Sequence, residues 1–206
     1  MINTKQLRCL IGVLGMLLPW IVLTLSLSFG YGFPNSISAT YFVDTCIAPF
    51  MIILGSAGIL LFTYKGYDIV DNILNTAAGI FGWGICLFPC AARSGNIGTF
   101  QIPAPTSDII HMISAIGFFG ILAYNSLFQF TKGVAEPTPH KKKRNVIFRI
   151  CGIGMIVSFV LLPFAIYGLI NVPHVIWWIE AIALAFFGIS WLTKANCIPW
   201  LFADKK

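Results

Sequence analysis

The residues of this chain that could do chemistry stand where long apolar runs begin or end. The segment "SISATYFVD" carries hydroxyls, a tyrosine and a carboxylate, and single polar residues mark the corresponding ends of other runs. The candidate ligand-binding residues are Ser36, Ser38, Tyr41, Asp44, Arg93, Asp108, His111, His174 and Glu180. They include three of the seven acids and two of the three histidines. A binding site needs several polar groups in one pocket, so we expect this segment to fold back over the others.

Carboxylates and imidazoles are also metal ligands, at about 2.0–2.2 Å. The candidate metal ligands are Asp108, His111, His174 and Glu180, with a serine of the "SIS" segment nearby. Such a set would suit a metal-dependent hydrolase within the membrane. The three-histidine zinc pattern with HxxxH, found in the alkaline-ceramidase and progestin-receptor superfamily, is missing from this sequence. No cofactor is therefore predicted, although a bound metal ion fits the residue types.

Several of these residues also have a purely structural explanation. Ser107 or Thr106 could cap a helix that begins there, while Asp108 favours the positive end of its dipole. Asp44 admits the same explanation at the start of another apolar run. His111 follows Asp108 by three residues, so a helix places both on one face and the carboxylate could orient the imidazole.

Glu180 is the residue that a structural explanation fits least. It stands about seven residues inside an apolar run, where a charge facing lipid would cost on the order of 2.5–3.5 kcal/mol. We expect it to face the interior of a helix bundle and to be hydrogen-bonded or protonated. His174, by contrast, follows Pro173 close to Trp177 and Trp178, and could serve with them as an anchor at the membrane interface.

The elements that must position these residues are membrane-spanning helices. Of the 206 residues, 58% are hydrophobic and 10% are charged, far below the roughly 25% charge of soluble domains. The sequence predicts an all-α protein with one domain over residues 1–206 and six spans of about 20 residues. The first run lacks a cleavage site and is expected to be retained. The spans are approximately 10–29, 46–64, 72–90, 109–130, 146–170 and 174–193.

Prolines interrupt four of these spans, and we expect them to kink the helices without ending them. They are Pro19, Pro49, Pro89 and Pro163.

The distribution of positive charge predicts the orientation. With the amino terminus in the cytoplasm, twelve of the thirteen lysines and arginines fall inside and one, Arg93, falls outside. Positive charge concentrates in cytoplasmic loops, so both termini are predicted to be cytoplasmic and the polar residues above lie at the outer end. "HKKKR", in the linker "KGVAEPTPHKKKRN", is expected to contact anionic lipids. No soluble nucleic-acid-binding motif accompanies it, so no nucleic-acid partner is predicted.

A second polar group lies at the opposite end of the third span. It consists of Asp71, Asn72, Asn75 and Asn125. Asp71 and Asn75 are four residues apart and share a helix face. Hydrogen bonds between helices explain this group adequately. Small residues nearby, in "AAGIFGWG" and "GIGM", indicate close helix packing.

The six cysteines divide between the two ends of the spans. Cys9, Cys151 and Cys197 are expected to be cytoplasmic and reduced. Cys46 and Cys90 fall at the outer ends of adjacent spans, where a disulfide is conceivable. The spacing in "CLFPC" differs from the CxxC of thiol oxidoreductases, so redox catalysis is not predicted.

Part of the chain resembles a family of small six-helix bacterial inner-membrane proteins. The resemblance rests on "SISATYF", on "CIAPFMIILGSAGILLFTYKGYDIVDNILNTAAGIFGWGICLFP" and on "IIHMISAIGFFGILAYNSLFQFTKG". It covers about residues 36–132, and its layout is distantly similar to the FRAG/DRAM/Sfk and domain-of-unknown-function membrane families. The resemblance implies a multi-pass protein of the bacterial inner membrane, without an established activity to transfer. The family-like positions are Ser36, Ser38, Lys65, Tyr67, Asp68, Asp71, His111 and Phe119.

Three functions agree with these observations. The preferred one is a bundle whose outer polar pocket holds a lipid headgroup or small solute. The second is a structural or accessory membrane subunit in which the polar residues join helices, and a homo-oligomer is compatible with it. The third is the intramembrane metal-dependent hydrolase. Convergence of the polar residues on one pocket separates the first from the second, because independent helix caps need not meet.

Overall fold

Six helices are long and apolar enough to cross a membrane in the part of the chain that the computed structural model describes, residues 3–133 and 138–197. The helices are α1 (Thr4–Ser28), α2 (Asp44–Thr63), α3 (Ile69–Leu87), α4 (Ala104–Tyr124), α5 (Pro139–Ile166) and α6 (Val175–Ala195). A π-helical turn, η2 (Asn125–Gln129), extends α4, and a 3-10 turn, η1 (Ser38–Phe42), precedes α2. The fold is all-helical, and its six apolar helices indicate a multi-pass membrane protein.

Each helix packs against the next in chain order and α6 packs against α1, so the six helices form a closed ring. Large side chains fill the interior, among them Phe118, Phe187 and Trp191, each about 1% exposed. Many apolar residues on the outward faces are exposed, as is expected when lipid rather than water surrounds a bundle. The loop between α3 and α4 carries a two-stranded hairpin, β1 (Asn96–Ile97) with β2 (Ile102–Pro103).

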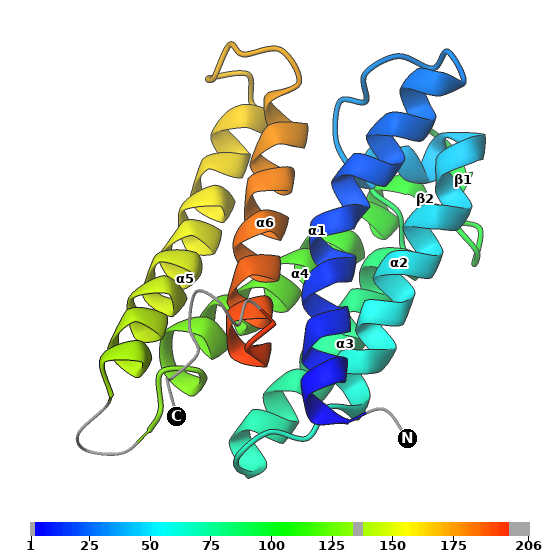
Figure 1. The fold of residues 1–206 in the computed structure, drawn as a ribbon. Coiled ribbons are helices and arrows are strands. Elements are labelled where there is room, and N and C mark those ends of the chain that lie inside the picture. The colour runs from blue at the N-terminus through cyan, green and yellow to red at the C-terminus, as the bar shows by residue number, and fades with distance from the viewer. Residues whose placement is uncertain (1–2, 134–137, 198–206) are drawn as a thin grey trace.

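We call the end of the bundle that contains the start of α1 and the end of α6 the inner end, and the opposite end, with η1 and the hairpin, the outer end (Figure 1). At the inner end, Asn3 begins α1 with a capping box: its side chain accepts from the Gln6 N–H at 2.8 Å while the Gln6 side chain accepts from the Asn3 N–H at 3.0 Å. This reciprocal pair satisfies two backbone donors that a helix start leaves free.

Several helix ends differ from the sequence prediction by a few residues, and two of these differences change an interpretation. α5 begins at Pro139, so "HKKKR" belongs to a helix and not to the linker; Thr138 caps this helix by accepting from the Lys141 N–H at 3.2 Å. α3 ends at Leu87, so the interpretation of Pro89 as a kink within a helix was wrong. A residue before proline avoids the helical conformation, and Phe88 has φ −119° and ψ 88°. The other three prolines do lie inside helices.

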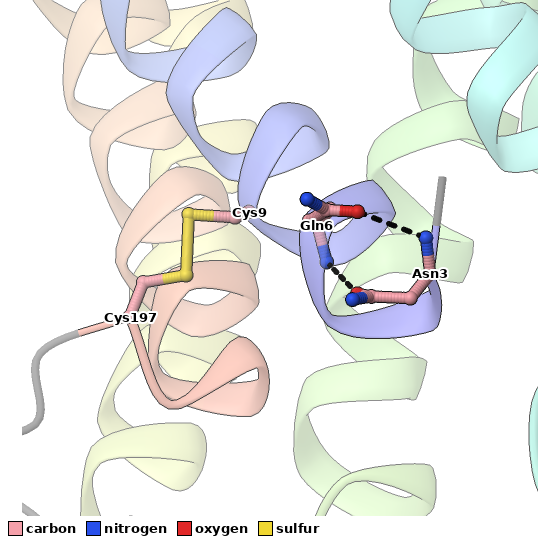
Figure 2. Close-up of a disulfide and its surroundings, with 4 residues drawn as sticks. All are labelled: Asn3, Gln6, Cys9 and Cys197. Carbon is pink, nitrogen blue, oxygen red and sulfur yellow. Dashed lines mark hydrogen bonds between the residues drawn. A yellow bond between two sulfur atoms is a disulfide. The ribbon is translucent and has the colours of Figure 1, made fainter. Parts of the chain in front are cut away.

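A disulfide joins Cys9 of α1 to Cys197, just after α6 (Figure 2). The expectation that both are reduced is therefore wrong for this structure. Packing of α1 against α6 brings their Cα atoms to 6.3 Å, within the usual range for a disulfide. Cys46 and Cys90 are free. The Cys46 thiol faces α1, where it donates to the carbonyl of Val22 at 3.3 Å.

The second polar group is buried at the start of α3. Asp71 is fully buried, and its carboxyl group accepts from the Tyr67 N–H at 3.0 Å and from the Asn75 amide at 2.7 Å. Asn75 in turn accepts from the Asn125 amide of η2 at 3.1 Å. Asn72 closes the preceding loop by accepting from the Gly66 N–H at 2.7 Å. These bonds connect α3 with the extension of α4.

Candidate binding pocket at the outer end

The segment from Asn35 to Phe42 folds over the outer mouth of the bundle and is held there by α6. The backbone N–H of Ile37 donates to the Glu180 carboxylate at 2.5 Å, and the Trp177 N–H donates to the Asn35 carbonyl at 3.1 Å. Within the segment, the Ser36 hydroxyl accepts from the Ala39 N–H at 2.9 Å and so starts the 3-10 turn. A loop of this polarity covers the mouth because its backbone groups find partners there.

His111 of α4 contacts the same segment. Its Nε2 lies 3.2 Å from the Ser38 hydroxyl, and its Nδ1 lies 2.9 Å from the carbonyl of Phe88. A carbonyl can only accept, so Nδ1 carries a proton. In the neutral ring Nε2 is then an acceptor for the Ser38 hydroxyl. The imidazole is 4% exposed, and these two bonds fix its tautomer and orientation.

Ser38 lies between His111 and Glu180. Its hydroxyl and backbone also interact with the Glu180 carboxylate, so side chains from η1, α4 and α6 meet at one point. Glu180 is only partly buried, because it borders a cavity. It faces the interior of the bundle, as a carboxylate at this depth requires.

Below these three residues lies a mostly apolar cavity of about 70 Å³. Phe50, Phe118, Phe119, Phe159 and Leu184 are among the side chains that line it. Above them an open cleft of about 290 Å³ reaches the surface. Ser38, His111 and Glu180 line both spaces. We call the two together the outer pocket: a polar ring between an open mouth and an apolar floor.

Asp108 and Ser36 line the cleft but do not join the polar ring. Asp108 accepts from the Ala91 N–H at 2.9 Å, and Ser107 donates to the Pro89 carbonyl at 2.7 Å. The interpretation of Ser107 as a helix cap and of Asp108 as a residue of the first turn was wrong, because α4 begins at Ala104, before both Ser107 and Asp108. They hold the α3–α4 loop against α4.

The remaining candidates lie outside the pocket. Asp44 is exposed in the first turn of α2, where it suits the helix dipole. Arg93 is exposed and donates to the Phe42 carbonyl at 2.7 Å. Tyr41 is buried against Phe50, with ring centroids 6.5 Å apart.

His174 begins α6 in the left-handed conformation, with φ 55°. Its ring packs on that of Phe33, with the ring centroids 4.4 Å apart. This contact favours the role of an aromatic anchor for His174 over that of a ligand. Phe33 also contacts Trp177 and Trp178, at 5.0 Å and 6.1 Å between centroids.

Some groups of the pocket carry no signal in the sequence. The Ile37 N–H and the Phe88 carbonyl are backbone atoms of unremarkable residues, and only the folded chain brings them to Glu180 and His111. Cys90 lines the cleft as well. Burial raises the pKa of its thiol to about 12, with the charges of Glu180 and Asp108 acting in the same direction. A thiol this hard to ionise is a poor nucleophile.

Among residues 3–133 and 138–197, no group of three or more histidine, cysteine, aspartate or glutamate side chains is arranged to hold a metal ion. The four candidate ligands are divided: His111 and Glu180 border the polar ring, Asp108 holds a loop and His174 packs on Phe33. The arrangement offers hydrogen bonding around a small apolar cavity.

Comparison with protein-family models, with curated proteins and with solved structures found no match to this chain. The resemblance to small six-helix bacterial inner-membrane proteins therefore stays a prediction, and the function has to be argued from the pocket.

Proposed function

We propose that this protein binds an amphiphilic molecule in the outer pocket, with the polar part of the ligand at the ring of Ser38, His111 and Glu180. The observation that carries the proposal is the meeting of these three side chains, from three separate elements, at the top of an apolar cavity. Pockets of this composition bind by burying apolar surface, while a few polar groups set the orientation.

The chemistry of the ring favours one class of head group. The Glu180 carboxylate has acceptor sites beyond the one that Ile37 N–H occupies, so it suits a ligand that donates. A free anionic group would meet the carboxylate in a partly desolvated site, where like charges repel strongly. We therefore favour a neutral or cationic head group that carries hydroxyl or amine donors.

Removing a polar contact from the ring should release this ligand while the protein still inserts and folds. We expect Glu180→Gln and His111→Ala each to reduce the amount of co-purifying amphiphile by about tenfold, the equivalent of one buried hydrogen bond of about 1.4 kcal/mol. Native mass spectrometry of the protein in mild detergent measures the bound fraction. Asp44→Asn is the matched control, because Asp44 lies exposed at the same end but outside the pocket.

A structural role is the second candidate, and one observation favours it. Glu180 and His111 each hold a backbone group of a loop, Ile37 N–H and Phe88 O respectively. If these bonds serve only to fasten loops, both variants should lose folded protein, and the wild type should carry no bound amphiphile. Equal ligand retention in Glu180→Gln and Asp44→Asn would also reject the binding proposal.

We further propose that the inner end faces the cytoplasm of a bacterium and the outer pocket faces the opposite side of the inner membrane. The distribution of lysine and arginine supports this orientation. In intact cells, a membrane-impermeant maleimide should label Phe100→Cys, at the exposed hairpin, and should not label Lys142→Cys, at the start of α5. The reverse labelling pattern would overturn the orientation.

The cysteine pair gives an independent check of the same orientation. The structure joins Cys9 to Cys197, whereas thiols are kept reduced in the cytoplasm, so a cytoplasmic inner end requires that both thiols be alkylated when cells are quenched rapidly. A pair that is fully oxidised in quenched cells would count against a cytoplasmic inner end. Lys205 and Lys206, which the orientation argument counts as cytoplasmic, lie outside the described residues.

A further inference from the structure

Three cations at the inner end converge on one aromatic cluster. Lys194 of α6 lies 4.2 Å from the ring centroid of Tyr67 and 4.8 Å from that of Phe130. Arg8 of α1 lies 5.5 Å from Tyr64, and Lys141 of α5 lies 5.9 Å from Phe148.

Three of these four rings, those of Tyr64, Phe130 and Phe148, are connected through Trp191 and Phe130. Its ring centroid lies 5.2 Å from that of Tyr64 and 5.3 Å from that of Phe130, and Phe130 lies 5.5 Å from Phe148. Cations on α1, α5 and α6, far apart in the sequence, are therefore neighbours in space. The charges of Arg8 and Lys141, with that of Arg144, act directly on Lys194.

Acidic groups balance this charge only in part within the described residues. Asp68 pairs with Lys132 at 2.9 Å, and the hydrogen bond from Lys132 lowers the pKa of Asp68, so its charge is already matched. Asp71 is a nearby negative charge that acts on Lys194, although its oxygens accept hydrogen bonds from Tyr67 and Asn75 and no ion pair between it and Lys194 is seen among the described residues. Lys194 is 8% exposed, and a buried cation without an ion pair is costly.

Hydrogen-bond donors without a partner lie in the same region. In the described part of the chain, the Trp191 indole N–H, the Gln129 amide and the Thr193 hydroxyl find no acceptor, although each side chain is 1% exposed. Trp191 belongs to the aromatic cluster, Thr193 precedes Lys194 and Gln129 precedes Phe130. Buried polar groups in native proteins nearly always have a partner, so these side chains indicate that a polar ligand or water occupies this region.

The disulfide lies close in the sequence to two of the three cations. Figure 2 shows the bond between Cys9 of α1 and Cys197 after α6; Cys9 follows Arg8 directly, and Cys197 follows Lys194 by three residues. The cations are thus positioned by the fold and not by loose surface chains.

We propose that the inner end contains a binding site for a phosphate-class anion, formed by Lys194, Arg8 and Lys141 around the aromatic cluster. Its charge neutralises three cations that no described acid pairs with, and its oxygens accept from the unpartnered donors. Two unpartnered acceptors, Asn125 Oδ1 and Gln129 Oε1, would take water that accompanies the anion. The ligand is either free phosphate or the phosphate of a lipid head group.

Thermal unfolding of the full-length protein in neutral detergent distinguishes the two sources. The probes are inorganic phosphate, dihexanoyl phosphatidic acid and dihexanoyl phosphatidylcholine, each compared with chloride at equal ionic strength. A rise of the unfolding temperature with inorganic phosphate assigns a free anion, and a rise with phosphatidic acid alone assigns a lipid head group. No rise with any phosphate probe overturns the proposal.

Two variants and a control connect the effect to this site. Lys194→Met keeps the length of the side chain and removes the charge, and we expect it to weaken the apparent affinity at least tenfold. Lys143→Met removes an exposed charge of the basic run "HKKKR", which also contains Lys141. This variant should change the apparent affinity for phosphate less than twofold. Equal weakening in both variants would mean that the anion responds to general positive charge and would reject the site.

Gln129→Met tests the unpartnered donors separately, in case Lys194→Met fails to fold. Methionine fills the same space without a buried amide, so this variant should unfold at a higher temperature than the wild type without phosphate. It should also gain less from phosphate. If Gln129 has only a structural role, Gln129→Met should unfold at a lower temperature than the wild type without phosphate. If phosphate raises the unfolding temperature of Gln129→Met as much as that of the wild type, Gln129 does not belong to the site. An unchanged gain in every variant that folds would reject the proposal.

Discussion

Replacing Asp71 by alanine is expected to lower the free energy of unfolding by about 3 kcal/mol. The side chain is fully buried and accepts two hydrogen bonds, from Tyr67 and Asn75. Losing a buried partner costs about 1–3 kcal/mol for each donor left behind. The loss should extend to Asn75, whose position for the bond to Asn125 depends on Asp71. Equilibrium unfolding in mixed micelles of a mild detergent and dodecyl sulfate measures the change.

Asp68→Ala is the matched control for this variant. Asp68 lies three residues earlier, caps α3 by accepting from the Asp71 N–H at 2.8 Å, and has a side chain 42% exposed. Water can replace most of the hydrogen bonds that this exposed carboxylate makes. Asp68→Ala should therefore lower the free energy of unfolding clearly less than Asp71→Ala. Equal losses at the two positions would show that Asp71 acts as a helix-start residue and not as a buried connection between helices.

Replacing Gly79 by alanine is expected to cost about 1–3 kcal/mol, the range for overpacking a close contact. A Cβ at this position would lie 2.6 Å from the Gly58 carbonyl oxygen and 2.7 Å from the Phe62 nitrogen. Both are backbone atoms of α2 that cannot move aside without separating α2 from α3. The same micelle unfolding experiment measures the effect.

Gly120→Ala should have the opposite sign. Gly120 lies inside α4, and a Cβ there would meet no atom within 4 Å. Alanine is favoured over glycine inside a helix by about 0.5–1 kcal/mol, so this variant should be as stable as the wild type or more stable. If Gly79→Ala were equally harmless, the close approach of α2 and α3 would not depend on that glycine.

The sequence was sufficient for the positions of the helices, because a chain in lipid must satisfy its backbone hydrogen bonds within each span. Six apolar runs therefore became six helices, and the structure differs mainly at their ends. Pro89 shows why the ends were harder: a proline can kink a helix or follow its last turn, and neighbouring contacts decide which. The start of α5 was missed because a charged first turn reads like a linker, although Thr138 and Pro139 are a good helix start.

The candidate site residues could likewise be predicted only in part. The cost of a charge in lipid was enough to predict that Glu180 faces inward, since that cost depends on depth along the helix and not on any particular neighbour. The sequence analysis placed Asp44 and Arg93 on the same predicted side of the membrane as Glu180, yet both are exposed in the structure. Polar residues at one level share a depth, but their direction around each helix axis is set by packing.

What the sequence determined by itself were the properties that depend on one segment at a time: the number of long apolar helices and the position of Glu180 along its helix. The tertiary structure decided which groups meet. Ile37 N–H meets Glu180, Phe88 O meets His111, and Cys9 meets Cys197. Two of these contacts use backbone atoms that every residue carries, and the third joins cysteines 188 residues apart. Such partners are selected by the ring order of the six helices, which no local pattern encodes.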